Sequence, residues 1–152
     1  MIQRIQTVYL LLSVILLVLC GMFPIATISP DDVSSPSLMY NMCIIDGNTG
    51  KWSFSVVGLL LVLIYVCVIT VFNIFGFKNR KRQMSRCVLS MVLLVIWLVG
   101  YVVICNTIVP EGALVRYEYP AVLPFIAILL QWLARNGIKH DEELIRAADR
   151  IR

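Results

Sequence analysis

The distribution of apolar and charged positions divides the chain into four long apolar runs separated by short charged segments. Two of these runs, residues 52–77 and residues 87–110, contain no Asp, Glu, Lys or Arg. At about 1.5 Å of helical rise per residue, either run is long enough to cross a hydrocarbon layer of about 30 Å. Runs of this length that are apolar on all sides are typical of membrane-spanning helices, whereas helices of soluble domains alternate apolar and polar faces.

The first apolar run lies close to the amino terminus. Residues 8–22 are mostly Leu, Val and Ile, and no charge occurs in residues 5–30. A cleavable secretory signal also has a cationic start and an apolar centre, and a lipoprotein signal needs a small residue before its cysteine. Because Leu19 precedes Cys20, we expect this segment to stay in the protein as a first span that ends near Pro24.

The last apolar run, residues 119–134, is shorter and contains Pro120 and Pro124. Proline is tolerated near the first turn of a helix, because its missing N–H would have no helical partner there. Tyr119 at one end and Trp132 at the other are typical of the membrane–water interface. We therefore expect a fourth span.

These runs predict an all-α membrane protein with four transmembrane helices in a single integral-membrane domain, residues 1–152. A composition that is 60% hydrophobic and 14% charged excludes an ordinary water-soluble domain. The predicted spans cover about residues 5–25, 54–75, 88–108 and 118–135, with an outer loop at residues 26–53 and a cytoplasmic tail at residues 136–152.

The outer loop carries signals for local structure. Residues 38–45 are mainly apolar but too short to span, residues 46–50 contain two glycines, and large and small side chains alternate in residues 51–56. Two strand-like runs joined by a short glycine-containing loop predict a β-hairpin. This hairpin is the best candidate for a surface that meets something outside the membrane.

Positive charge is distributed unevenly. Eleven of the thirteen Lys and Arg residues precede the first span, separate the second and third spans or lie between Arg135 and the end of the chain, and the other two are Lys51 and Arg116. Cytoplasmic loops carry the excess of Lys and Arg, so we expect both termini to be cytoplasmic. The net charge of +4 therefore indicates a lipid bilayer as partner and no nucleic acid. The residues expected at the membrane surface are Lys78, Arg80, Lys81, Arg82 and Arg86.

The tail ends in an amphipathic segment, residues 141–152. Acids crowd its start and arginines its end, which suits a helix dipole, and Asp141 is placed to cap it. We expect a short helix that either covers the bundle or the membrane surface, or docks on a protein partner; its glutamates are also placed to meet the basic turn at residues 80–86. The expected partner-binding residues are Leu144, Ile145, Ala148 and Ile151, with Glu142 and Glu143.

The two ends of the chain, residues 1–7 and residues 141–152, resemble those of a family of small inner-membrane proteins of Gram-negative bacteria. The members of that family have four predicted helices and form a domain of unknown function. The resemblance implies a four-helix architecture and a place in the bacterial inner membrane, and it supplies no activity.

Five cysteines are candidates for chemistry, but none forms a Cys-x-x-Cys pair. Lone cysteines are usually small buried hydrophobes. Because Cys20, Cys43 and Cys105 all lie near the predicted outer face, one disulfide among them is left open.

Met39, Met42 and Cys43 form a cluster of soft donors that would suit Cu(I). Methionine and cysteine side chains of a strand that faces lipid or the bundle would explain the cluster equally well. His140, the only histidine, adjoins Asp141 and is expected to be solvated or to take part in capping. We expect no cofactor.

Three classes of function remain open. The centres of the predicted spans lack ionisable residues, and Asn73, Asn106 and Gln131 lie near span ends, which argues against proton-coupled transport. An enzyme would need a catalytic motif, and none is recognisable. A passive channel or carrier would need polar residues that converge inside the bundle. We therefore expect a non-catalytic structural or accessory subunit that binds a partner through its outer loop or its tail.

Overall fold

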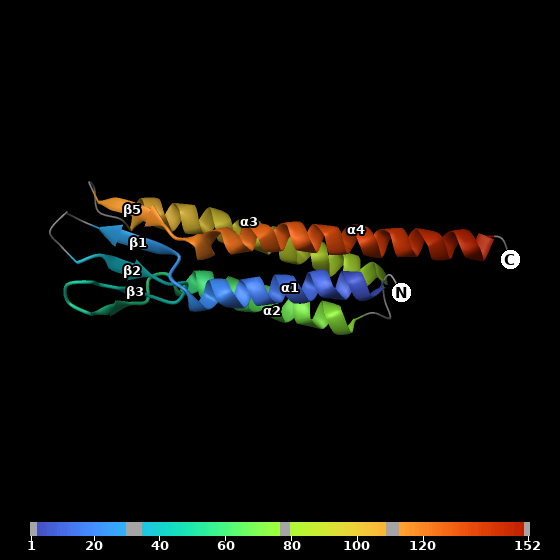
Figure 1. The fold of residues 1–152 in the computed structure, drawn as a ribbon, viewed down its shortest axis with the longest axis horizontal. Coiled ribbons are helices and arrows are strands. Elements are labelled where there is room, and N and C mark those ends of the chain that lie inside the picture. The colour runs from blue at the N-terminus through green and yellow to red at the C-terminus, as the bar shows by residue number, and fades with distance from the viewer. Residues whose placement is uncertain (1–2, 30–34, 77–79, 109–112, 151–152) are drawn as a thin grey trace.

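The computed structural model describes residues 3–29, 35–76, 80–108 and 113–150. Four long helices lie side by side along the longest axis of the molecule (Figure 1). They are α1 (Gln3–Met22), α2 (Val57–Phe75), α3 (Arg80–Thr107) and α4 (Leu123–Arg150), and a 3-10 turn, η1 (Tyr119–Val122), leads into α4. Both termini lie at one end of the bundle, here called the terminal end, and the strands lie at the other, the sheet end.

All four helical segments are long and apolar enough to cross a membrane. The prediction of four long apolar helices is therefore confirmed. Many apolar side chains of these helices face outward; Leu61, for example, is 61% exposed and Val99 is 58% exposed. Apolar side chains on all sides suit a lipid environment, because hydrocarbon imposes no penalty on exposed Leu or Val.

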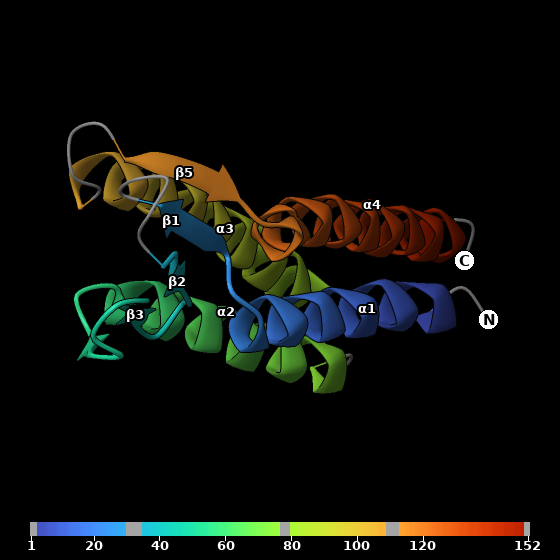
Figure 2. The same cartoon turned by 60° about the vertical axis from the view of Figure 1, so that its left-hand side comes forward.

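The sheet end contains an antiparallel sheet of five strands, so the prediction of an all-α protein is wrong. Figure 2 shows β1 beside β5 above the ends of the helices. The strands are β1 (Ala26–Ser29), β2 (Ser37–Met39), β3 (Ile44–Ile45), β4 (Trp52–Ser53) and β5 (Leu114–Tyr117), in the spatial order β4-β3-β2-β1-β5.

The predicted hairpin is present as the β3–β4 pair, with Ile44 opposite Ser53 and Ile45 opposite Trp52. What the sequence reasoning missed is the pairing of β1 with β5, in which Thr27 lies opposite Arg116. Those two strands come from different loops, and local turn signals do not report a pairing between distant segments. Two loops thus share one sheet.

The sheet packs directly onto the bundle. Ile28 of β1 and Met39 of β2 join a buried cluster with Leu17, Leu63 and Trp97 of three helices. A second cluster lies toward the terminal end and contains Leu10, Cys87, Ala134 and Ile138. The sheet end and the helices therefore form one continuous body.

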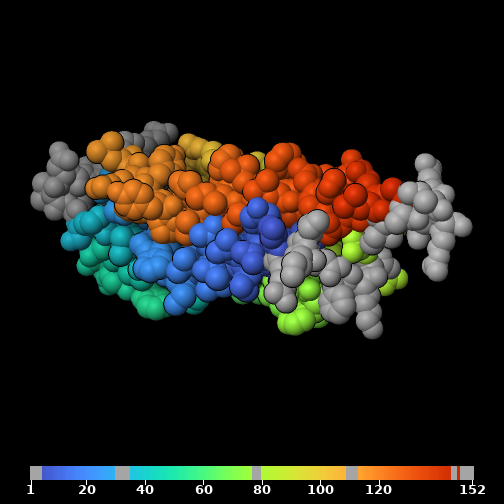
Figure 3. Space-filling view, turned by 45° about the vertical axis from the view of Figure 1, so that its right-hand side comes forward, coloured from blue at the N-terminus to red at the C-terminus, as the bar shows by residue number. Residues whose placement is uncertain are grey.

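The tail is not a separate helix, which corrects the sequence prediction. Helix α4 continues without a break to Arg150, and Asp141 lies inside it and is buried instead of capping a new helix. Gly137 would ordinarily weaken a helix, but here it lies against the side chain of Gln6 on α1. The packing of α1 along α4, visible in Figure 3, supports the helix past the glycine.

Candidate functional site: a groove at the sheet end

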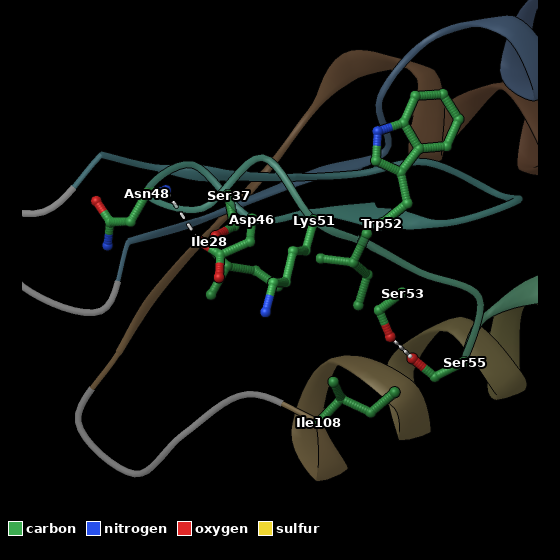
Figure 4. A pocket seen from close by; sticks show the side chains of 10 residues that line it. Ile28, Ser37, Asp46, Asn48, Lys51, Trp52, Ser53, Ser55 and Ile108 are labelled. Carbon is green, nitrogen blue, oxygen red and sulfur yellow. Dashed lines mark hydrogen bonds between the residues drawn. The ribbon is translucent and has the colours of Figure 1, made fainter.

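A groove of about 580 Å³ lies at the sheet end, between the sheet and the nearby ends of α2 and α3 (Figure 4). Several elements contribute polar side chains to this groove. Its lining residues are Ile28, Ser37, Ile44, Asp46, Asn48, Lys51, Trp52, Ser53, Ser55 and Ile108.

The apolar part of the groove comes from three isoleucines. Ile28 belongs to β1 and is 6% exposed, Ile44 belongs to β3 and is partly buried, and Ile108 directly follows α3 and is 38% exposed. Because strand residues alternate between the two faces of a sheet, one face of this sheet can contribute apolar side chains here while the other faces elsewhere. The groove thus has an apolar surface that reaches the end of a long helix.

The turn between β3 and β4 supplies one charged side of the groove. One oxygen of Asp46, Oδ1, accepts the backbone N–H of Asn48 at 2.9 Å and that of Thr49 at 3.4 Å, and Oδ2 accepts the Thr49 hydroxyl at 3.0 Å. These bonds, the Asn48 one first, hold the pKa of Asp46 below its usual value of 3.8, and the nearby Lys51 contributes by attraction. Gly50 adopts a φ of 65°, which a glycine allows without strain.

Lys51 is the cation of the lining. Figure 4 shows its side chain directed into the space between the sheet and the end of α3, and the neighbouring Trp52 ring on the other side of the strand. Its ammonium group has no hydrogen-bond or ion-pair partner among the described residues. Ser53 and Ser55 lie farther along the groove, with their hydroxyl oxygens 2.8 Å apart.

Buried polar groups attach the sheet to the bundle. The Asn41 amide donates to the backbone oxygen of Cys20 at 2.7 Å and accepts the Trp97 indole N–H at 3.1 Å. The Tyr101 hydroxyl donates to the backbone oxygen of Ile25 at 2.8 Å. Sequence reasoning did not single out Asn41, Trp97 or Tyr101, since each stands in an apolar run where only the three-dimensional contact reveals its role.

A second polar cluster lies inside the helix bundle. Gln131 on α4 is fully buried; its oxygen accepts the Ser90 hydroxyl at 2.6 Å, and its amide donates to the Thr70 hydroxyl at 3.3 Å. The Asn73 amide, also buried, donates to the Cys87 sulfur at 3.0 Å. Neighbouring helices therefore satisfy Gln131 and Asn73, which connect α2, α3 and α4 within the core.

At the terminal end, Asp141 joins three helices. Its Oδ2 accepts the Gln6 amide at 2.7 Å and lies 3.7 Å from a guanidinium nitrogen of Arg80. The sequence analysis expected Glu142 and Glu143 to meet the basic turn. In the structure Arg80 of that turn pairs with Asp141, and Glu143 pairs with Lys139 at 3.8 Å.

The predicted partner-binding residues of the tail are only partly described. Leu144 is 50% exposed and Glu143 is exposed, whereas the side chains of Ile145 and Ala148, and residue Ile151, lie outside the described residues. Among the predicted membrane-surface cations, Lys78 lies outside them as well. Arg86 donates to the backbone oxygen of Phe72 at 3.1 Å at the end of α2, so it serves the fold.

The three predicted soft donors differ in their exposure to solvent. Met39 is 1% exposed within the core and Cys43 is buried, but Met42 is 40% exposed. Within the described part of the chain, no group of three His, Cys, Asp or Glu side chains is placed to hold a metal ion. The thiols of the candidate disulfide cysteines Cys20, Cys43 and Cys105 are free.

The fold and site define a class: a bundle of four membrane-length helices that carries an antiparallel sheet with a groove at one end. The chain belongs to the family described as "Domain of unknown function (DUF4293)", whose model matches residues 2–151. The resemblance of the chain to a family of uncharacterised proteins is thereby confirmed. No curated protein matches the sequence.

Proposed function

We propose that this protein is a non-catalytic accessory subunit of the bacterial cytoplasmic membrane that recognises a partner with its sheet end. In this proposal the four helices span the membrane, both termini are cytoplasmic and the sheet lies on the outer side. The orientation is supported by the charge distribution, because α3 begins with Arg80, Lys81 and Arg82 at the terminal end of the bundle and the terminal half of α4 carries Lys139.

The observation that carries the proposal is the way the sheet is built and held. Two loops combine into one sheet, and the bonds of Asn41 and Tyr101 hold that sheet against the helices. Because the sheet is already held in place, binding at its groove costs little conformational entropy, which favours recognition of a partner.

A passive channel is the second candidate, and one observation favours it. Thr70, Ser90 and Gln131 place polar groups inside the bundle, as a channel would require. These groups bond to one another, however, and the buried Leu63 and Leu94 belong to the adjoining core. A hydrogen-bonded cluster of this kind connects helices in a membrane without requiring a pore, so the accessory-subunit proposal is preferred.

Topology is tested by labelling single cysteines in a variant without the native ones. Asn48 and Lys81 are both exposed and lie at opposite ends of the bundle. A membrane-impermeant maleimide added to intact cells from which any outer membrane has been removed should label Asn48→Cys and leave Lys81→Cys unlabelled until the inner membrane is opened. Labelling of Lys81→Cys alone would reverse the orientation.

Partner recognition is tested by purification in mild detergent with two matched apolar-to-acid variants. Ile44→Asp changes the groove, and Leu144→Asp changes the exposed tail. A partner recognised by the sheet end should be lost at least tenfold from Ile44→Asp and retained by Leu144→Asp, with both variants matching the parent in expression and helix content. Loss from Leu144→Asp alone would assign recognition to the tail, against the proposal.

A further inference from the structure

We propose that the groove binds the monoanionic phosphodiester headgroup of a phospholipid from the leaflet at the sheet end. This inference rests on the proposed function, because it places the groove at a membrane surface, and it names a ligand for that site. It is carried by the hydrogen-bonding capacity that the lining residues leave unused, by their charge and by the position of the groove relative to the helices.

The side-chain acceptors of the lining are already engaged by the protein. Both oxygens of Asp46 accept bonds from the turn that follows it. The Asn48 side-chain oxygen accepts the backbone N–H of Ser35 at 3.1 Å, and the Ser37 hydroxyl oxygen accepts that of Gly47 at 3.3 Å. The protein itself thus satisfies part of the acceptor capacity of each of these side chains.

The donors of the lining are, in contrast, unused. Lys51 Nζ, the Asn48 side-chain amide and the Ser37 hydroxyl hydrogen have no acceptor among the described residues. The Ser53–Ser55 pair shares one hydrogen bond, which leaves one of its two hydroxyl hydrogens free. A group made of acceptor oxygens complements this set, and a phosphodiester offers such oxygens together with a negative charge.

The charge of the lining selects among anions. Of the ten lining residues, Lys51 carries the positive charge and Asp46 the negative one. Attraction to Lys51 favours an anion, while the carboxylate of Asp46 disfavours a second negative charge on the same ligand. A phosphodiester with one charge fits better than a phosphomonoester, which carries up to two near neutral pH.

The position of the groove supplies the argument for a lipid. Ile108 directly follows α3 and Ser55 lies just before α2, so the groove opens at the level where two membrane-length helices end. Trp52 and Phe54, which are 59% and 53% exposed, stand in the same segment and suit the headgroup layer. Ile28 and Ile108 offer apolar contact to the glycerol and upper acyl region that follows the headgroup.

The test measures lipid binding to the purified, delipidated full chain in a non-ionic detergent by native mass spectrometry. The probes are a phosphatidylglycerol, with one phosphodiester charge, and a phosphatidic acid with the same acyl chains. Phosphatidylglycerol should bind more tightly. Lys51→Gln should weaken its binding by roughly tenfold, as expected for loss of a charge-assisted bond. Lys51→Arg should restore most of the affinity, and the control Lys139→Gln, an exposed cation in the terminal half of α4, should change little.

A second variant tests the selectivity. Asp46→Asn keeps an oxygen for the turn but removes the negative charge, so it should raise the affinity for phosphatidic acid relative to phosphatidylglycerol. Equal effects of Lys51→Gln and Lys139→Gln, a parent preference for phosphatidic acid, or equal binding of inorganic phosphate and phosphatidylglycerol would each overturn the inference. If lipid binding is indifferent to Lys51 while Ile44→Asp still loses its partner protein, the inference fails and the proposed function stands.

Discussion

Replacing Asn41 by alanine should loosen the sheet from the bundle. In the folded protein the Asn41 amide satisfies two groups of the bundle, the Trp97 indole N–H at 3.1 Å and the backbone oxygen of Cys20 at 2.7 Å. Trp97 is 1% exposed, so its N–H would have no water to replace the lost acceptor. An unpaired buried donor costs about 1–3 kcal/mol and an ordinary lost hydrogen bond about 1 kcal/mol, so we expect Asn41→Ala to lower the unfolding free energy by roughly 3 kcal/mol.

The assay is equilibrium unfolding in mixed micelles, followed by circular dichroism, with hydrogen exchange to locate the loosened amides. Asn106→Ala is the matched control, because among the described residues that exposed amide bonds to Val102 of its own helix, and its loss should cost about 0.5 kcal/mol or less. Exchange in Asn41→Ala should rise first at β1 and β2, next to the lost contacts.

A double-mutant cycle separates the bond from the change in size. Trp97→Phe removes the same donor, so the cost of Asn41→Ala should fall by about 1–2 kcal/mol in that background. The reasoning is refuted if Asn41→Ala costs no more than Asn106→Ala, or if the two substitutions at positions 41 and 97 are additive.

Three further predictions concern the terminal end and the turn. Asp141→Ala should destabilise the protein by roughly 2 kcal/mol and Asp141→Asn by less in the same unfolding assay, because an amide oxygen still accepts the buried Gln6 amide. Gly47→Ala should destabilise the sheet, because a Cβ at that position would collide with backbone oxygens. Gly58→Ala is its control: it lies in helix α2 with open space around it, so alanine should raise the unfolding free energy by up to about 1 kcal/mol. The pKa of Asp46 is lower in the folded protein than in the unfolded chain. The stability that ionised Asp46 contributes is therefore present above its unfolded pKa, near 4, and is lost as the pH falls through the lower folded pKa. Hydrogen exchange at the β3–β4 turn should rise over that pH range, and Asp46→Asn should abolish the rise.

The helices were predictable because each span depends on its own composition. A charge-free run such as residues 52–77 predicts a spanning helix without knowledge of its neighbours. The β3–β4 hairpin was predictable for the same reason, since its strands and turn are adjacent in sequence. Both features are local, and the structure contains both.

The features that escaped prediction depend on contacts between distant residues. Aspartate commonly caps the start of a helix, which is why Asp141 was expected to do so. Its burial against Gln6 and Arg80 follows instead from the antiparallel packing of α1 and α3 with α4. The sequence places Gln131 near the end of a span but does not identify its hydrogen-bond partners, Ser90 and Thr70, which belong to two other helices. The groove itself needs residues from several elements, so no single window of sequence contains it.

The pairing of β1 with β5 also constrains the order in which the protein can be completed. Strand β1 follows α1 directly, whereas β5 immediately precedes η1 and α4. During synthesis β1 therefore exists while its neighbour on that edge has yet to be made, and its edge lacks a partner until residues 114–117 reach the same side. Ile28, which lines the groove, belongs to this strand. The strand that carries Ile28 is thus paired on both edges only after the final loop has reached the same side, and a chain stopped before residue 113 would carry an open edge instead.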